Sequence, residues 1–303
     1  KMKSIAATAG PERMLMLNHG AGSSHFRHLL RAYGSDSRAE PAFAQCRGPR
    51  DVGFRLTFGE SANSPERTDM ANAECIVLIG SHIGENLHNG QVQTLAEALN
   101  RGVSLITVDP RFSVPAGKSK YWLPIKPGTD MALLLAWMNV LITEELYDKD
   151  YIERYTTGFE QLARHVRDYT PEWVYLETGI NPDVIRQTAR EMAKAAPATV
   201  VHPGRHAVWY GDDTQRSRAI AMLNALLGSW NRKGGFYIPE KVSLPNYPLP
   251  EYPKPKAKTA DAYPGKWPFA GQGVTNGVID ASFGDDAFFK GWLVYGTNLP
   301  QTI

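Results

Sequence analysis

One stretch of the chain has the pattern of a buried strand, a helix and a second buried strand. Residues 73–80 read AECIVLIG, and residues 103–111 read VSLITVDPR, each with a short apolar run. Between them, QVQTLAEALNRG places apolar side chains on one side of a helix and ends at Gly102, a typical helix terminator. Strands that are apolar on both faces are typical of parallel sheets covered by helices. The pattern predicts an α/β protein with an open, doubly wound parallel sheet.

The alternation of strand and helix recurs in the rest of the chain. We expect further strands in RMLMLN, YWLPIKPGTD, ATVVHPGRHAVW and FFKGWLVYGTN, and further helices in HFRHLLRAYGS, MALLLAWMNVLITEEL, PDVIRQTAREMAKAAP and DTQRSRAIAMLNALLG. Either Thr129 or Asp130 is expected to cap the second of these helices. A Pro-rich excursion at about residues 239–268, which includes SLPNYPLPEYPKPKAK, is typical of an extended surface segment.

Charge, apolar runs and cysteine number argue against several classes of partner and of structure. A formal charge of +2 on 303 residues is too small to indicate nucleic acid as the main partner. The longest apolar run, at 131–142, is much shorter than the roughly 20 residues that cross a bilayer, so no direct membrane span is expected. Only Cys46 and Cys75 occur, which excludes a disulfide framework and a zinc knuckle.

The segments that follow the expected strands combine glycine with polar side chains. They read NHGAGSSH, GSHIGEN, DPRFS, PGTD, PGRH and YGTN. In open α/β sheets, ligands bind beyond the carboxyl ends of the strands, and glycine lets backbone N–H groups approach a phosphate. Asp109 and Asp130 could accept hydrogen bonds from ribose or a guanine edge, and Arg111 could face a phosphate. The alternative is that these glycines only end strands and helices, but the set together favours a ligand that carries a nucleotide.

Cys46 lies in a loop-like run at 39–54 that contains prolines and is followed by Arg47 and Arg50. These arginines would lower the pKa of a free thiol if they lie close to it. A lone cysteine is nevertheless more often a small buried apolar residue, and Cys75, inside an apolar strand, is expected to have that packing role. The residues by themselves leave the role of Cys46 open.

Several segments together resemble the molybdopterin oxidoreductase family. They are RTDMANAECIVLIGSHIGEN, GVSLITVDPRFSVPAGKSKYWLPIKPGTDMALLLAWMNVLI, LYDKDYIERYTTGFEQL and LNALLGSWNRKGGFY. The motifs VDPRFS, IKPGTD and RKGG are most similar to the polysulfide and thiosulfate reductase branch of this family. The resemblance implies two Rossmann-like domains that face each other across the cofactor. We expect the first to comprise residues 1–46 plus 206–303, and the second, inserted domain to comprise 47–205.

The resemblance also implies site residues. Cys46 is expected to ligate molybdenum, and Arg205 and His206 are expected to bind an anionic substrate or deliver a proton. The cofactor would be molybdenum bis(molybdopterin guanine dinucleotide). Its expected contacts are Gly80, Ser81, His82, Glu85, Asn86, Asp109, Pro110, Arg111, Gly128, Thr129, Asp130, Gly204, Gly296 and Asn298.

By resemblance, the chain is expected to be the central part of a catalytic subunit that reduces a sulfur oxoanion or polysulfide. The cysteine motif of the family's 4Fe-4S cluster is not in the sequence, so we expect this segment to be inactive alone. Expected partners are an iron–sulfur electron-transfer subunit and a membrane quinol-oxidising subunit, in the periplasm. Open alternatives are tetrathionate, arsenate or selenate reduction, a relative that has lost the metal and serves as a structural or electron-transfer subunit, and a simple nucleotide-binding α/β protein.

Overall fold

The computed structural model describes residues 1–19, 23–40, 48–62, 66–81, 83–85, 89–204, 212–238, 242–243, 245, 247–256 and 280–298. The chain divides into two compact units, one made of Lys1–Gly48 with Val242–Ile303 and the other of Pro49–Lys241. Each unit contains a parallel sheet.

The unit Pro49–Lys241 is built on a four-stranded sheet. Its strands are β3 (Cys75–Ile79), β4 (Ser104–Val108), β5 (Tyr121–Leu123) and β6 (Thr199–Val201), in the order β5-β4-β3-β6. All neighbouring strands run parallel, and β3 pairs with β4 from Cys75 opposite Ser104 to Ile79 opposite Val108. Every residue of β3 is buried, as expected for a central strand of a parallel sheet covered by helices. The predicted α/β class with parallel sheets is confirmed.

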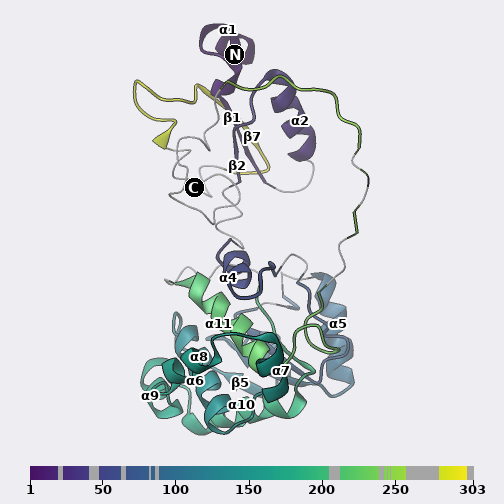
Figure 1. The fold of residues 1–303 in the computed structure, drawn as a ribbon, viewed down its shortest axis with the longest axis vertical. Coiled ribbons are helices and arrows are strands. Elements are labelled where there is room, and N and C mark those ends of the chain that lie inside the picture. Colours follow the sequence, from purple (N-terminus) through teal and green to yellow (C-terminus); the bar gives the residue numbers. More distant parts are fainter. Residues whose placement is uncertain are drawn as a thin grey trace. The chain divides into compact units, whose positions relative to one another are not determined.

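Helices surround this sheet. They are α4 (Gly48–Phe58), α5 (Asn89–Asn100), α6 (Asp130–Thr143), α7 (Lys149–Tyr155), α8 (Phe159–Val166), α9 (Pro171–Thr178), α10 (Pro182–Ala195) and α11 (Asp213–Leu226), with a short 3-10 turn, η2 (Ala116–Lys118). Figure 1 shows α5 apart from the group formed by α6, α9 and α10. Helix α6 is the centre of that group, and its buried Trp137 donates from Nε1 to Thr188 Oγ1 of α10 at 2.9 Å. In the described part of the chain, no helix has both the length and the apolar character needed to cross a membrane.

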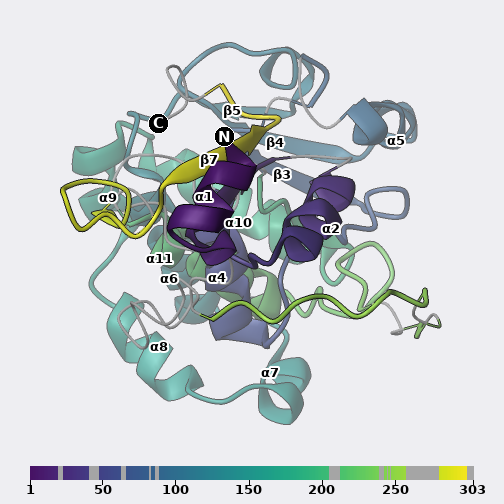
Figure 2. The same ribbon diagram turned by 90° about the horizontal axis from the view of Figure 1, so that it is seen from above.

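The other unit contains a three-stranded parallel sheet, in the order β2-β1-β7. Its elements are α1 (Met2–Thr8), η1 (Pro11–Arg13), β1 (Met14–Asn18), α2 (Ser23–Tyr33), β2 (Arg38–Ala39) and β7 (Gly291–Tyr295). Strand β7 comes from the far end of the chain and pairs with β1 from Gly291 opposite Met14. The helices α1 and α2, purple in Figure 2, contribute Ile5, Phe26 and Leu30 to a cluster with the methionines of β1.

The division between the units differs from the boundary expected at 205/206. The structure assigns the chain as far as Lys241 to the unit that begins at Pro49. The reason is α11, which packs against α6 and β6 of that unit and buries Ile220, Leu223 and Leu226.

Part of the run at 39–54 is also helical rather than a loop, because α4 begins at Gly48. Pro49 is compatible with that start, since proline is favoured in the first turn of a helix.

The Pro-rich segment is extended where the structure describes it. Residues 247–256 contain no helix or strand, and Tyr247 is 83% exposed. Tyr252 rests on α2, where its hydroxyl lies 2.9 Å from His28 Nδ1 and the Arg31 guanidinium lies over its ring. The predicted extended surface segment is confirmed for these residues, and Tyr252 covers the surface of its own unit.

Candidate functional site

The order of the strands in the unit Pro49–Lys241 creates a switch point between β3 and β6. From β3 the chain proceeds to β4 and β5 on one side, and β6 then pairs with the other side of β3. The connections that leave β3 and β6 therefore diverge at the carboxyl edge of the sheet, which is where open α/β sheets bind ligands.

The segment after β3 offers open backbone and a buried hydroxyl. Gly80 has a φ of +57°, and no heavy atom lies within 4 Å of the position that a side-chain Cβ would take. Ser81 is 3% exposed, and its Oγ finds no hydrogen-bond partner among the described residues. A ligand with a hydrogen-bonding group would satisfy this hydroxyl.

Asp109, directly after β4, also presents a buried polar atom. It is 3% exposed, and its Oδ1 accepts a hydrogen bond from the backbone N–H of Arg111 at 2.9 Å, which turns the chain past Pro110. Trp122 Nε1 fixes the backbone by donating to Asp109 O at 2.9 Å. The second carboxylate oxygen, Oδ2, is buried and has no partner in the described part of the chain. Because leaving such an atom unsatisfied is costly, Asp109 is suited to accept from a ligand donor.

Arg111 and Glu85 bind each other. Arg111 Nη2 donates to Glu85 Oε2 at 2.5 Å, and Val114 N donates to Glu85 Oε1 at 2.9 Å. The pair joins the segments that follow β3 and β4. Both residues are expected cofactor contacts, and in the structure they hold the two segments together.

The start of α6 is held by Arg216 of α11. Arg216 Nε donates to Asp130 Oδ2 at 2.7 Å, Nη2 donates to Ile79 O at the end of β3 at 3.3 Å, and Nη1 lies 3.6 Å from Asp213 Oδ1. Gly128 supplies the turn before α6 with a φ of +84°. Thr129 is the N-cap residue, one of the two that were expected, although its hydroxyl donates to Lys126 O and makes no hydrogen bond to the helix backbone.

Gly204, after β6, is fixed from both sides. Its N–H donates to His202 Nδ1 at 3.0 Å, and its carbonyl accepts from Arg50 Nη1 of α4 at 2.5 Å. The same Arg50 nitrogen donates to Glu66 Oε1 at 2.6 Å, within a site that is almost fully buried.

Gly296 follows β7 in the other unit, with Asn298 two residues further on. Gly296 has a φ of +67°, and a Cβ at this position would collide with the carbonyl oxygen of His19, so only glycine fits here. The expected residues Cys46, His82, Asn86, Arg205 and His206 lie outside the described residues, and their roles stay predictions.

The sequence reasoning missed Arg216 as a site residue and considered Arg50 only as a neighbour of Cys46. A signal for Arg216 exists, because it lies four residues before Ile220 and seven before Leu223, on the apolar face of α11. A charged residue on such a face needs a buried partner, which for Arg216 is Asp130.

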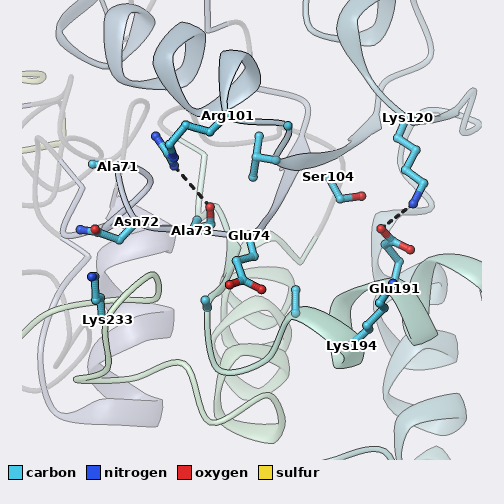
Figure 3. Close-up of a pocket in the computed structure, with 14 residues that line it drawn as sticks. Ala71, Asn72, Ala73, Glu74, Arg101, Ser104, Lys120, Glu191, Lys194 and Lys233 are labelled. Carbon is cyan, nitrogen blue, oxygen red and sulfur yellow. Dashed lines mark hydrogen bonds and ion pairs between the residues drawn. The ribbon is translucent and has the colours of Figure 1, made fainter.

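A cavity of about 780 Å³ lies at the opposite edge of the sheet, where the strands begin. Figure 3 shows its charged rim, in which Lys120 pairs with Glu191 and Arg101 donates to Ala73 O. Arg101 and Lys194 lie at the C-terminal ends of α5 and α10, where basic side chains complement the helix dipoles. Helix termini thus explain much of the basic charge on this rim. The candidate functional site is therefore the carboxyl edge of the sheet.

A parallel sheet with glycine, serine and aspartate beyond the carboxyl ends at a switch point is typical of nucleotide-binding and dinucleotide-binding α/β proteins. Residues 1–244 match the family model described as Molybdopterin oxidoreductase. The chain belongs to the molybdopterin oxidoreductase family.

This chain is similar to several relatives whose names describe different enzymes. The thiosulfate reductase molybdopterin-containing subunit PhsA of Salmonella typhimurium is 32% identical, over 100% of this chain and 42% of the relative. The arsenate respiratory reductase molybdopterin-containing subunit ArrA of Shewanella sp. (strain ANA-3) is 33% identical, over 62% of this chain and 24% of the relative. The solved structure of acetylene hydratase from Pelobacter acetylenicus matches 75% of this chain and 31% of that chain, with a TM-score of 0.63 and 30% identity. The chain thus spans less than half the length of these relatives.

Proposed function

We propose that the full-length protein is the catalytic subunit of a molybdenum-dependent oxidoreductase that reduces a sulfur oxoanion or polysulfide. The observation that carries the proposal is the alignment of the whole chain with a thiosulfate reductase subunit. The polar edge at the switch point supports it, since a family cofactor with a nucleotide would bind there.

The cofactor of this proposal is molybdenum bis(molybdopterin guanine dinucleotide), and the residues at the carboxyl edge fit a group of that kind. Ser81 Oγ and Asp109 Oδ2 are buried polar atoms without a partner among the described residues, and the space beside Gly80 is open. In this proposal Asp109 accepts from a ribose or guanine donor, while the backbone at Gly80 and Gly204 lets the ligand approach closely. When bound, the cofactor supplies two-electron chemistry coupled to movement of an oxygen or sulfur atom.

The catalytic roles rest on three residues named from the family pattern. Cys46 would offer a thiolate, a soft ligand suited to the metal. Arg205 would bind the anionic substrate by charge-assisted hydrogen bonds, and His206 would hold or deliver a proton. The protein thus supplies a ligand, an anion site and a proton donor.

The partners follow from the same proposal. Electrons would arrive through a 4Fe-4S cluster in the full-length subunit and a separate iron–sulfur subunit, and ultimately from a membrane quinol-oxidising subunit. PhsA is named as a molybdopterin-containing subunit, which supports assembly into a complex of this kind. We further propose a periplasmic location.

The experiment is an anaerobic assay of the full-length protein with thiosulfate and polysulfide, beside tetrathionate, arsenate and selenate. The proposal expects turnover with the sulfur compounds, which is lost in Cys46→Ala. The match to an arsenate reductase subunit makes arsenate the main competing substrate, and preferential arsenate turnover would replace the proposed substrate class. Absence of molybdenum together with no turnover of any acceptor would favour the non-catalytic relative that has lost the metal.

A further inference from the structure

Arg50 occupies an unusual place for a cation. It lies in the first turn of α4, its side chain is 2% exposed, and the Glu66 side chain beside it is 1% exposed. Asp51 Oδ1 lies 3.6 Å from Arg50 Nε. Burying an ion pair carries a large desolvation cost, and an apolar pair of similar volume is often equally stable. Stability alone therefore does not account for a buried arginine at this position.

What the guanidinium adds is a fixed backbone position. Arg50 Nη1 donates at 2.5 Å to the carbonyl of Gly204, a residue in the left-handed region with a φ of +68°. On the other side, the Gly204 N–H donates to the ring of His202, which is 0% exposed and whose Nε2 lies 3.2 Å from Gln91 Oε1. Two buried side chains, Arg50 and His202, thus hold Gly204 in place just after the end of β6.

The two ends of this contact lie next to the candidate catalytic residues in the sequence. Arg50 comes four residues after Cys46, and Gly204 directly precedes Arg205 and His206. We propose that Arg50 is a positioning residue that fixes the segment leading into Arg205 and His206 relative to the helix that follows Cys46. The inference rests on the proposed function, because it assigns Arg50 a role in anion binding through Arg205.

The geometry of arginine is required for this role. Both hydrogen bonds come from Nη1, whose two N–H bonds are held in the plane of the guanidinium and so point in fixed directions, whereas the ammonium of lysine is a point charge on a flexible stem. Arg50→Lys keeps the charge that Glu66 faces but is expected to lose the fixed orientation toward Gly204 O. In a second variant, Arg50→Met with Glu66→Met, the ion pair and the contact to Gly204 are both removed. Because both members of the pair are replaced, neither Arg50 nor Glu66 is left buried without the other.

The test uses the full-length holoprotein and a control variant, Arg190→Met with Glu144→Met. That control removes a bidentate ion pair between α10 and the end of α6, with distances of 2.7 and 2.8 Å. Molybdenum content, thermal midpoint, kcat, KM for thiosulfate and the pH profile are measured for each protein. We expect both Arg50 variants to keep their molybdenum but to show KM raised about tenfold or more, the factor expected for a lost hydrogen bond of a charged group. The control should keep the wild-type KM.

The outcomes separate the two proposals. Wild-type protein without molybdenum, or with molybdenum and no turnover of thiosulfate or polysulfide, overturns the proposed function and this inference with it. An active wild-type enzyme combined with an unchanged KM and pH profile in both Arg50 variants overturns the positioning role alone. If the double variant fails to fold, Arg50→Lys decides: a raised KM at a wild-type thermal midpoint supports the role, and any other result contradicts it.

Discussion

Arg216 and Asp130 form a largely buried ion pair that joins the starts of α11 and α6 to the end of β3. The Nε–Oδ2 distance is 2.7 Å, and the side chains are 8% and 14% exposed. The same guanidinium reaches the carbonyl of Ile79, the last residue of β3. Arg216 thus sets the relative positions of α11, α6 and β3 at the edge where the cofactor is proposed to bind.

Replacing Arg216 with Gln should destabilise the protein strongly. The change removes the positive charge that Asp130 and Asp213 both face, and breaking a buried pair from one side costs about 3–5 kcal/mol. Chemical unfolding followed by fluorescence measures the effect. Arg154→Gln is the control, because its pair with Asp150 is exposed and should contribute less than about 1 kcal/mol. Equal effects of the two substitutions would contradict the role given to Arg216.

Gly53 should not tolerate a side chain. A Cβ there would lie 2.7 Å from Thr214 O and 2.8 Å from Ser217 Cβ, because α4 packs closely against α11. Gly53→Ala is expected to lower the free energy of unfolding by about 1–3 kcal/mol through overpacking. Gly90→Ala, in a helix where nothing lies within 4 Å of the new Cβ, should instead be neutral or stabilising by up to about 1 kcal/mol. The reverse order of stability would show that the two helices do not approach as described.

The ion pair of Lys120 and Glu191 should contribute stability only in a defined pH range. Its hydrogen bond lowers the pKa of Glu191 and raises the pKa of Lys120. Both groups are charged at neutral pH, so Lys120→Met should cost at most about 1 kcal/mol there, given that Lys120 is half exposed. The difference from wild type should vanish as pH falls through the lowered pKa of Glu191, or as pH rises through the raised pKa of Lys120. A difference that does not change with pH would instead indicate lost packing of the lysine stem.

Cys75 should be unreactive in the folded protein. It is 0% exposed, and burial raises the pKa of its thiol, which suppresses the reactive thiolate. Alkylation at pH 8 followed by mass spectrometry of the Cys75 peptide should show no label until the protein is unfolded. Labelling at native conditions would mean that β3 opens readily.

Much of the unit Pro49–Lys241 could be predicted because its pattern is local. The apolar runs of β3 and β4, the glycine after α5 and the aspartate at the start of α6 all reflect burial, turns and dipoles within a few residues. Cys75 was likewise correctly assigned to packing, and it is fully buried.

What the sequence could not predict depends on contacts between distant residues. The division after Lys241 follows from the packing of α11, and the contact from Arg50 to Gly204 joins residues 154 positions apart. Glu85 and Arg111, both expected cofactor contacts, also bind each other across 26 positions. Periodicity and short motifs carry no information about which charged side chains meet across such separations.

The central claim is that this chain contributes to a molybdenum site. The most direct measurement is metal and nucleotide analysis of the full-length protein, purified without oxygen, by mass spectrometry of the metal and of nucleotides released by acid. The account predicts molybdenum stoichiometric with the polypeptide and guanine nucleotide released with it. Protein that folds and assembles with neither molybdenum nor guanine nucleotide would contradict the account.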